Sequence, residues 1–284
     1  MIKTNKDFLP IQAVQGFVWQ AKGNGMPRIT VDGDAVWLPS TGGITYNAQI
    51  GDNCIKWVAD HLEPGVTARH KDDSHNHAFQ MLSCIGNTAI IKSGDAKGEK
   101  GFVTGKHGGC EHLILYFSPD ILEKMDIDDK IMIYATGQGM ALTEHKDIYL
   151  RNMSPILLEK MNITEDGKKL KIGVAKIIPA KIMGSGLGTV GTTRGDYDIT
   201  MFDDETVEKY KLDSLRFGDI VAITDADNLY GRSYRKGACS IGVISHGGCV
   251  IAGHGPGVTT LITTSKPLIE TFIDKKANLA NYFL

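Results

Sequence analysis

The stretch KGACSIGVISHGGCVIAGHGPGV, residues 236–258, decides the fold that this sequence predicts. Its apolar runs, residues 241–244 and 249–252, are too short for helices and predict buried strands. The glycine-rich segments after each run predict turns, because glycine accepts backbone conformations that other residues avoid. His246 and His254 would then lie at strand ends, where a rigid sheet presents side chains to a ligand.

The composition is that of a soluble globular protein rich in β-structure. Of the 284 residues, 42% are hydrophobic and 23% are charged, and this length suffices for two domains. The chain has 33 glycines and only 9 prolines, which favours tight turns and β-structure over a helical bundle. The formal net charge of -2 gives no reason to expect nucleic-acid binding.

The cysteines and the N-terminus indicate a cytoplasmic protein. The five cysteines include no Cys-x-x-Cys pair, and their odd number is typical of reduced thiols in the cytoplasm. The N-terminal residues lack the apolar core of a signal peptide. No apolar run approaches the roughly 20 residues that span a bilayer, so we expect no membrane association.

The predicted architecture is mainly β, with barrel-like or sandwich-like domains and a few short helices. The polar segment 162–169 contains a turn and is interpreted as a linker. It divides the chain into two β-rich domains, residues 1–161 and 162–284. Apolar residues at helical spacing after Lys266 predict a closing C-terminal helix.

A polar segment in the first half carries several candidate metal ligands. In an extended chain His75 and His77 would point to the same face, because side chains alternate along a strand. Two imidazoles in that arrangement can share one metal ion, with Asp60, His61 or Glu63 completing the shell. The alternative is a solvated loop whose histidines bind nothing, since the spacing matches no specific zinc motif.

The tetrad His-Gly-Gly-Cys occurs twice, at residues 107–110 and 246–249. Each copy follows a short apolar run, so both predict a turn with a histidine at its entrance. Either the two halves are distantly duplicated barrels, or the tetrads match by chance in a glycine-rich chain. A Cys–His metal pair is one interpretation, but buried cysteines usually behave as inert small hydrophobic residues.

The glycine-rich segment at residues 183–188 does not predict a dinucleotide site. Its spacing is Gly-x-Gly-x-Gly, and no long amphipathic helix follows it. A dinucleotide-binding fingerprint needs Gly-x-Gly-x-x-Gly at the start of such a helix. We therefore expect no nucleotide cofactor.

Residues 86–105, GNTAIIKSGDAKGEKGFVTG, predict a strand, a glycine turn and a second strand. This stretch resembles the KOW motif of small SH3-like barrels. The resemblance implies binding to RNA or to another protein. The basic edge would be formed by Lys92, Lys97, Lys100 and Lys106.

Residues 195–200, GDYDIT, and the stretch around His246 resemble the core of the acetamidase/formamidase family. A glycine–aspartate strand start at residues 218–219 lies between them in the same order. The resemblance implies a metal ion that activates water for amide hydrolysis, with Asp198 and His246 as ligands. Where that family has Gly-Asp-x-His, this chain has Gly-Val-Ile-Ser-His at residues 242–246.

Four further stretches are GITYN at residues 43–47, DHLEPGV at 60–66, MGSGLG at 183–188 and GHGPG at 253–257. Through them the chain resembles an uncharacterised prokaryotic two-domain family of unknown function. This resemblance covers most of the chain and implies no established activity.

We interpret the sequence as that of a metal-dependent hydrolase of a small amide-like substrate. Imidazole and carboxylate groups can hold zinc, manganese or calcium, and a bound ion lowers the pKa of water. The candidate metal ligands are Asp60, His61, Asp198, His246 and His254. The candidate substrate-binding residues are Asn47, Gly253 and Gly255. Their alternative role is structural, because polar turn residues cap backbone groups.

The alternative function is non-enzymatic. In that case the KOW-like segment would bind RNA or protein and would need no metal. For the hydrolase we expect a small-molecule ligand and a homo-oligomer.

Overall fold

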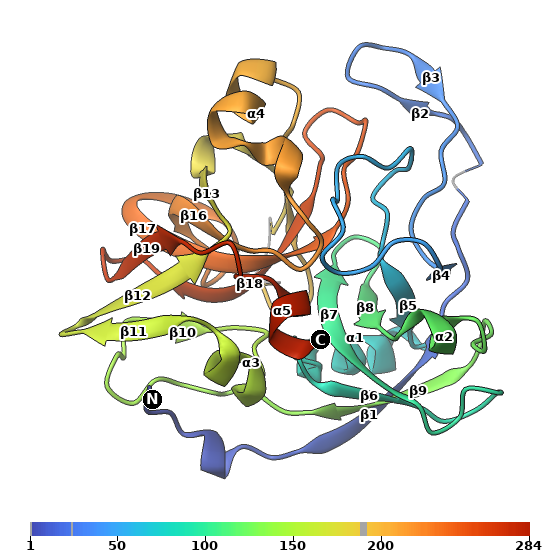
Figure 1. The fold of residues 1–284 in the computed structure, drawn as a ribbon, viewed down its shortest axis with the longest axis horizontal. Helices are drawn as coiled ribbons and strands as arrows, with labels where there is room; N and C mark the ends of the chain where they lie inside the picture. The colour runs from blue at the N-terminus through green and yellow to red at the C-terminus, as the bar shows by residue number, and fades with distance from the viewer. Residues whose placement is uncertain (1, 24, 188–191) are drawn as a thin grey trace.

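The computed structural model describes residues 2–23, 25–187 and 192–284 (Figure 1). Strands make up most of the fold and the helices are short, which confirms the predicted mainly β architecture. The α-helices are α1 (Asp73–Leu82), α2 (Pro119–Leu122), α3 (Pro155–Lys160), α4 (Asp204–Tyr210) and α5 (Leu279–Phe283). Single 3-10 turns are η1 (Lys6–Phe8), η2 (Ala180–Ile182) and η3 (Leu212–Ser214).

Six strands of the N-terminal half close into a barrel. They follow the order β1-β9-β6-β7-β8-β5, and β5 pairs back with β1, with Ala68 opposite Val18. Closure gives both edges of the sheet a partner. The strands are β1 (Gln12–Val18), β5 (Gly65–Arg69), β6 (Thr88–Ile91), β7 (Lys100–His107), β8 (His112–Tyr116) and β9 (Lys130–Ala135), with the short β4 (Ile44–Thr45) beside β5.

The C-terminal half forms an open, half-barrel sheet in the order β13-β16-β17-β18-β15-β14. Its long strand β17 is continuously buried from Ala238 onward, because both of its faces are covered. The strands are β13 (Lys176–Pro179), β14 (Met183–Gly186), β15 (Tyr197–Ile199), β16 (Ile220–Asp227), β17 (Ser233–His246) and β18 (Gly257–Thr264), and β10 (Tyr149–Leu150) pairs with β18.

Two of the predictions are wrong, because the residues concerned form strands of a smaller sheet. Residues 162–169, interpreted as a linker, instead contain β11 (Ile163–Asp166) and the turn into β12 (Lys169–Val174). The segment after Lys266 forms β19 (Ile269–Ile273), not a helix, because it pairs in parallel with β12. A helix begins only at α5. The remaining hairpin joins β2 (Arg28–Ile29) and β3 (Ala35–Val36).

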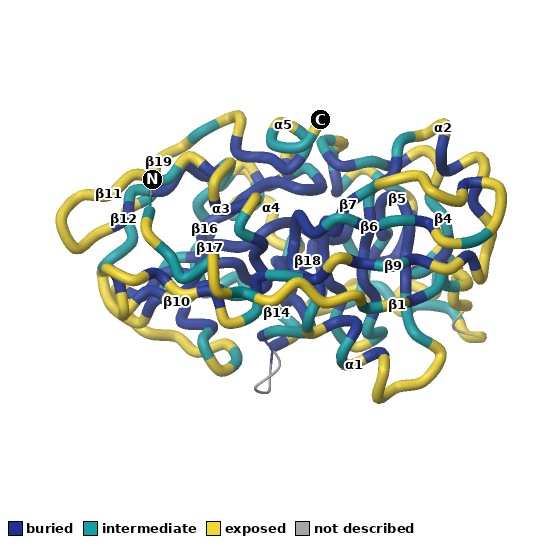
Figure 2. Tube along the Cα trace, turned by 90° about the horizontal axis from the view of Figure 1, so that it is seen from below, coloured by how far each residue is buried: buried dark blue, intermediate teal, exposed yellow. Residues whose placement is uncertain are grey.

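The buried hydrophobic residues form two clusters, and each contains residues from both halves of the chain. Strand β7 packs against β17, where a Cβ atom at Gly105 would lie 2.5 Å from the Cβ of Ser245. On the other side, Lys106 N donates to Thr259 Oγ1 of β18 over 3.1 Å, and that hydroxyl donates to Lys106 O over 3.1 Å. Figure 2 shows these central strands as buried segments surrounded by exposed loops. The packing therefore brings the ends of β7 and β17 together.

Two local predictions about extended structure are wrong. Residues 249–252 form a loop and not a strand. Residues 73–82 form α1, where the Asp72 side chain caps the helix by accepting from His75 N over 2.9 Å. His75 and His77 therefore lie two apart on a helix and face different directions. The predicted β-turn-β unit is present as β6 and β7. Gly188, the last residue of the glycine-rich segment 183–188, lies outside the described residues.

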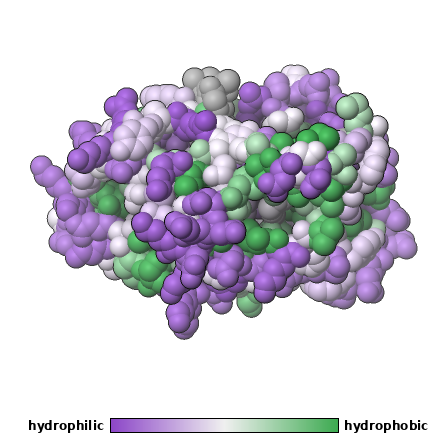
Figure 3. All heavy atoms as spheres, turned by 90° about the horizontal axis from the view of Figure 1, so that it is seen from above, coloured by the Kyte–Doolittle hydropathy of each residue, from purple (hydrophilic) through white to green (hydrophobic). Residues whose placement is uncertain are grey.

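The face of the molecule in Figure 3 is mostly hydrophilic, with apolar side chains gathered in its right half. Within residues 2–23, 25–187 and 192–284, no helix has the length and apolar character needed to cross a membrane.

Candidate functional site

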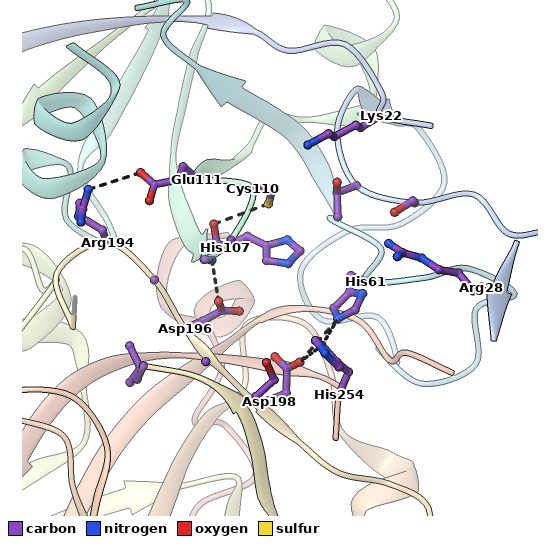
Figure 4. A pocket seen from close by; sticks show the side chains of 18 residues that line it. Lys22, Arg28, His61, His107, Cys110, Glu111, Arg194, Asp196, Asp198 and His254 are labelled. Atoms are coloured by element: carbon purple, nitrogen blue, oxygen red, sulfur yellow. Dashed lines mark hydrogen bonds and ion pairs between the residues drawn. The ribbon is translucent and has the colours of Figure 1, made fainter. Parts of the chain in front are cut away.

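A cavity of about 410 Å³ opens where the two halves meet (Figure 4). Its volume lies within the roughly 300–1,000 Å³ of small-molecule sites. The charged and nucleophilic side chains that line it come from both halves of the chain. They are Lys22, Arg28, His61, His107, Cys110, Glu111, Arg194, Asp196, Asp198 and His254.

Three ligand atoms converge at one end of this cavity, and we call His61, Asp198 and His254 the outer cluster. His61 Nε2 lies 3.2 Å from His254 Nδ1. Asp198 Oδ2 lies 3.1 Å from His254 Nδ1 and 3.6 Å from His61 Nε2. Figure 4 shows the three side chains pointing toward one another. Burial would raise the pKa of Asp198, but hydrogen bonds from His254 and His61 hold it below its ordinary value.

A buried carboxylate fixes the orientation of His61. Asp60 Oδ1 lies 2.8 Å from His61 Nδ1, and Asp60 Oδ2 accepts from Arg28 Nε over 2.6 Å. This arrangement leaves His61 Nε2 facing the cluster, in the way that a carboxylate on the other ring nitrogen orients a metal-bound histidine. Burial alone would lower the pKa of His61, but hydrogen bonds to Asp198 and Asp60 raise it to about 12. His61 also has a positive φ of 55°, a strained conformation of the kind found at functional sites.

A second group lies deeper, and we call Asp196, Asp198 and His246 the inner cluster. Their ligand atoms all lie within 4.8 Å of one another. Asp196 and Asp198 share a face because they are two residues apart in extended chain. The strand register brings Asp198 and His246 together. Asp198 on β15 and His246 at the end of β17 are both paired with Gly257 on β18.

Glu63 organises the histidines of the first half. It is buried, and its Oε1 accepts from His107 Nδ1 over 2.6 Å and lies 3.0 Å from His112 Nδ1. Burial would raise the pKa of Glu63, but His112 and His107 hold it well below its usual range. The contact with Nδ1 leaves the Nε2 of His107 available on the cavity side. Burial and the nearby His246 lower the pKa of His107.

The two His-Gly-Gly-Cys copies lie side by side. The rings of His107 and His246 stack with centroids 4.0 Å apart. In each copy the cysteine faces a carboxylate of residues 60–63, with Cys249 Sγ 2.8 Å from Asp60 Oδ1 and Cys110 Sγ 3.8 Å from Glu63 Oε1. Burial raises the pKa of both thiols. Neither cysteine is therefore an activated nucleophile at neutral pH.

Positive side chains also line the cavity, and Arg28 among them lies beside His61 of the outer cluster. Figure 4 shows Lys22 and Arg28 on one wall and Arg194 on the opposite one. Arg194 Nη1 lies 3.7 Å from Glu111 Oε2, and Arg28 holds Asp60. Such groups suit an anionic part of a small molecule.

The structure places the residues predicted from sequence in different settings. Of the metal candidates, His61, Asp198, His246 and His254 come together, whereas Asp60 lies behind His61. Gly255 supports Asp198, because its N donates to Asp198 Oδ2 over 3.4 Å. Gly253 and Asn47 are exposed and do not line the cavity.

The histidines of the polar segment and the KOW-like lysines lie apart from the cavity. His70, Asp72 and His75 form a surface group, in which Asp72 serves as the cap of α1. Lys92, Lys97 and Lys100 are exposed. Lys106 is fully buried, so it is not part of an exposed basic edge.

Several site residues did not stand out in the sequence. The spacing of Asp196 and Asp198 on a predicted strand indicates two carboxylates on one face, and this signal could have identified Asp196. His107 was interpreted as a turn residue, although its tetrad matches that of His246. Lys22 and Arg194 come from separate segments with no pattern to connect them.

Two family models match the chain. The N-terminal model of DUF4438, a domain of unknown function, matches residues 27–159, and the C-terminal model matches residues 160–283. The crystal structure of TM1086 is similar, with a TM-score of 0.96 and 43% sequence identity over 100% of this chain and 99% of that chain. No curated protein matches the sequence. The chain therefore belongs to the two-domain DUF4438 family, whose function is unknown.

Proposed function

We propose that this protein is a metal-dependent hydrolase of a small amide-like substrate, with a divalent ion held by the outer cluster. The observation that carries the proposal is the spacing of three ligand atoms, which lie 3.1, 3.2 and 3.6 Å apart. Four-coordinate zinc, with bonds of about 2.0–2.1 Å, holds its ligand atoms about 3.3–3.4 Å apart. Three protein ligands beside a cavity leave one position for water or substrate, as in catalytic zinc sites.

The donor set favours zinc or manganese. Two imidazoles and one carboxylate suit these ions, whereas calcium prefers a shell of about 6–8 oxygen ligands. When bound, the ion lowers the pKa of water and polarises a carbonyl oxygen.

The buried charges of the site support a resident cation. Asp60, Glu63, Asp196 and Asp198 are all nearly inaccessible to solvent. Buried carboxylates are paired with cations or coordinate metals, because an uncompensated charge is strongly destabilising away from water. Arg28 compensates Asp60, and histidines face the other three. A divalent ion would supply this compensation without protonating the histidines.

His107 is suited to transfer protons during hydrolysis. It lines the cavity, and Glu63 fixes its Nδ1, so its Nε2 can accept a proton from water and return it to a leaving amine. Its lowered pKa keeps the imidazole neutral at pH 7. A neutral imidazole is the form needed by a general base.

The walls of the cavity indicate the substrate class. Lys22 would pair with a carboxylate of the substrate. The resemblance of residues 195–200 to the acetamidase/formamidase family supports an amide as the scissile group. The substrates to compare are therefore small amides with and without a carboxylate.

Elemental analysis of purified, tag-free protein tests the metal site. We expect about one or more divalent ions per chain and a clear loss of metal in His254→Ala, since three-ligand sites weaken sharply when one ligand is removed. His77→Ala is the matched control, because His77 lies on α1 outside the cluster. Folded protein that binds no metal after incubation with zinc, manganese or calcium would sink the proposal.

Hydrolysis assays test the reaction. We expect release of amine from small amides in the metal-loaded protein, with kcat lower by on the order of 100-fold in His107→Asn at unchanged metal content. Carboxylate-bearing amides should show a lower KM than neutral ones, and Lys22→Ala should remove that difference. Equal turnover by wild-type protein and His107→Asn would exclude His107 as the proton-transfer group.

A further inference from the structure

The inner cluster contains two buried polar atoms without a hydrogen-bond partner. Asp196 Oδ2 and His246 Nε2 are both inaccessible to solvent, and neither makes a hydrogen bond among the described residues. They nevertheless lie only 2.7 Å apart. An ion pair between Asp196 and a protonated His246 is one account of this approach, and a cation that both atoms bind is the other. Buried polar atoms are almost always partnered, and the surroundings of the two atoms favour the cation.

The other atoms of both side chains are already in use. Asp196 Oδ1 accepts from Gly108 N over 2.7 Å. His246 Nδ1 lies 3.0 Å from Gly247 O, a contact in which the ring nitrogen must donate. This hydrogen bond directs Nε2 into the cluster, where it faces Asp196 Oδ2, and metal-bound histidines are held in the same way through their other nitrogen.

Gly257 keeps the space beside these two atoms clear. A Cβ atom at residue 257 would lie 2.0 Å from Asp196 Oδ2 and 2.1 Å from His246 Nε2. Gly257 is not among the glycines with a positive φ, so its backbone does not require glycine. The absence of a side chain at residue 257 instead leaves space between Asp198 and His246, which are paired with Gly257 on the two neighbouring strands.

We propose that the inner cluster binds a second divalent metal ion, so that the site is a dinuclear centre bridged by Asp198. The ligands are Asp196 Oδ2, His246 Nε2 and Asp198 Oδ1, which lies 3.6 Å from His246 Nε2. The other oxygen of the same carboxylate, Oδ2, belongs to the outer cluster. One carboxylate therefore faces both positions, as in two-metal hydrolases whose ions lie about 3.5–4 Å apart.

This inference rests on the proposed function, because the outer ion is the partner of the inner one. A second ion would extend the chemistry from activation of water to stabilisation of both the attacking and the leaving groups. It would also compensate the negative charge of the buried Asp196.

Manganese binding to metal-depleted protein tests the inference. We expect about two manganese ions per chain, with the spin-coupled electron paramagnetic resonance spectrum of neighbouring ions. Asp196→Asn and Gly257→Ala should each reduce binding to about one ion and replace the coupled spectrum with that of an isolated ion. Asp213→Asn, an exposed aspartate of the same half, should keep both ions.

The possible results separate the two proposals. One ion per chain that is lost in His254→Ala but kept in Asp196→Asn and Gly257→Ala would overturn the inner site and leave the proposed function standing. Two ions without spin coupling would also overturn the dinuclear centre. Absence of any bound manganese or zinc in folded wild-type protein would overturn both. Wild-type stoichiometry and spectrum decide the question even if a variant does not fold.

Discussion

The histidines of this site depend on the contacts of both ring nitrogens, the one that faces the cavity or cluster and the one that is held by the surrounding protein. His61, His107 and His246 each have one ring nitrogen held by a carboxylate or a carbonyl oxygen. The sequence predicted His246 as a site residue because it lies at a strand end before a glycine turn, and His61 because it lies in a polar segment rich in possible metal ligands. It did not predict the supporting contacts, since Glu63 reaches its histidines only after β7 and β8 are in place.

Replacing Glu63 tests the importance of this support. In Glu63→Gln at least one of the imidazole N–H groups of His107 and His112 loses a charged acceptor in a buried site. We expect the free energy of unfolding to fall by about 3 kcal/mol, the loss typical of a broken buried ion pair. Urea denaturation of metal-free protein measures this value. The exposed Glu99→Gln should change it by less than about 0.5 kcal/mol, and equal losses in the two variants would contradict the account.

At the scale of elements, turns and helix caps override the extended pattern that the sequence suggests. The sequence suggested an extended segment at His75 and His77, but Asp72 caps a helix there, and α1 buries Phe79 against the barrel. Residues 249–252 are apolar enough for a strand, yet their neighbours Gly247 and Gly248 hydrogen-bond to residues 62 and 54 instead of a strand partner. Both differences arise from contacts that are distant in sequence.

The capping role of Asp72 predicts a local effect. Asp72→Ala removes the acceptor for His75 N and should lower the free energy of unfolding, because an N-cap side chain satisfies a backbone N–H of the first turn. Asp73→Ala is the matched control, because it removes an exposed carboxylate of the first turn and its ion pair with Arg69 but leaves the cap in place; such surface pairs contribute less than about 1 kcal/mol. Urea denaturation compares the two. A larger loss in Asp73→Ala would show that Asp72 is not the cap that stabilises α1.

At the scale of the whole molecule, the site exists because the two halves of the chain share their buried hydrophobic clusters. His61 and His107 come from the first half, whereas Asp198, His246 and His254 come from the second. The sequence predicted the β-rich class from glycine content and short apolar runs, which are local properties. It could not predict that β7 packs against β17, because that contact joins strands separated by half the chain.

Burial of Lys106 between the two halves has an effect on stability that can be measured. Its buried ammonium group on β7 donates to Asn152 Oδ1 and to Thr193 O, over 2.8 and 2.6 Å. Burial lowers the pKa of Lys106 from its ordinary 10.5 to about 8. Between these two values the unfolded chain holds the proton and the folded chain does not, so the contribution of Lys106 to stability rises with pH.

The change expected from pH 8 to 10.5 is about 3 kcal/mol, since each pKa unit corresponds to about 1.4 kcal/mol. The measurement is the free energy of unfolding of wild-type protein relative to Lys106→Met across this pH range. Lys100→Met, an exposed position on the same strand, should run parallel to wild type. Parallel curves for wild type and Lys106→Met would mean that Lys106 is charged in the folded protein throughout.

The most direct test of the metal site is anomalous X-ray diffraction from crystals of the protein grown with zinc or manganese. We predict an anomalous peak within about 2.0–2.3 Å of His61 Nε2, His254 Nδ1 and Asp198 Oδ2, and a second peak beside Asp196 and His246. A peak only at the surface group of His70, Asp72 and His75, or none at saturating metal, would contradict the account.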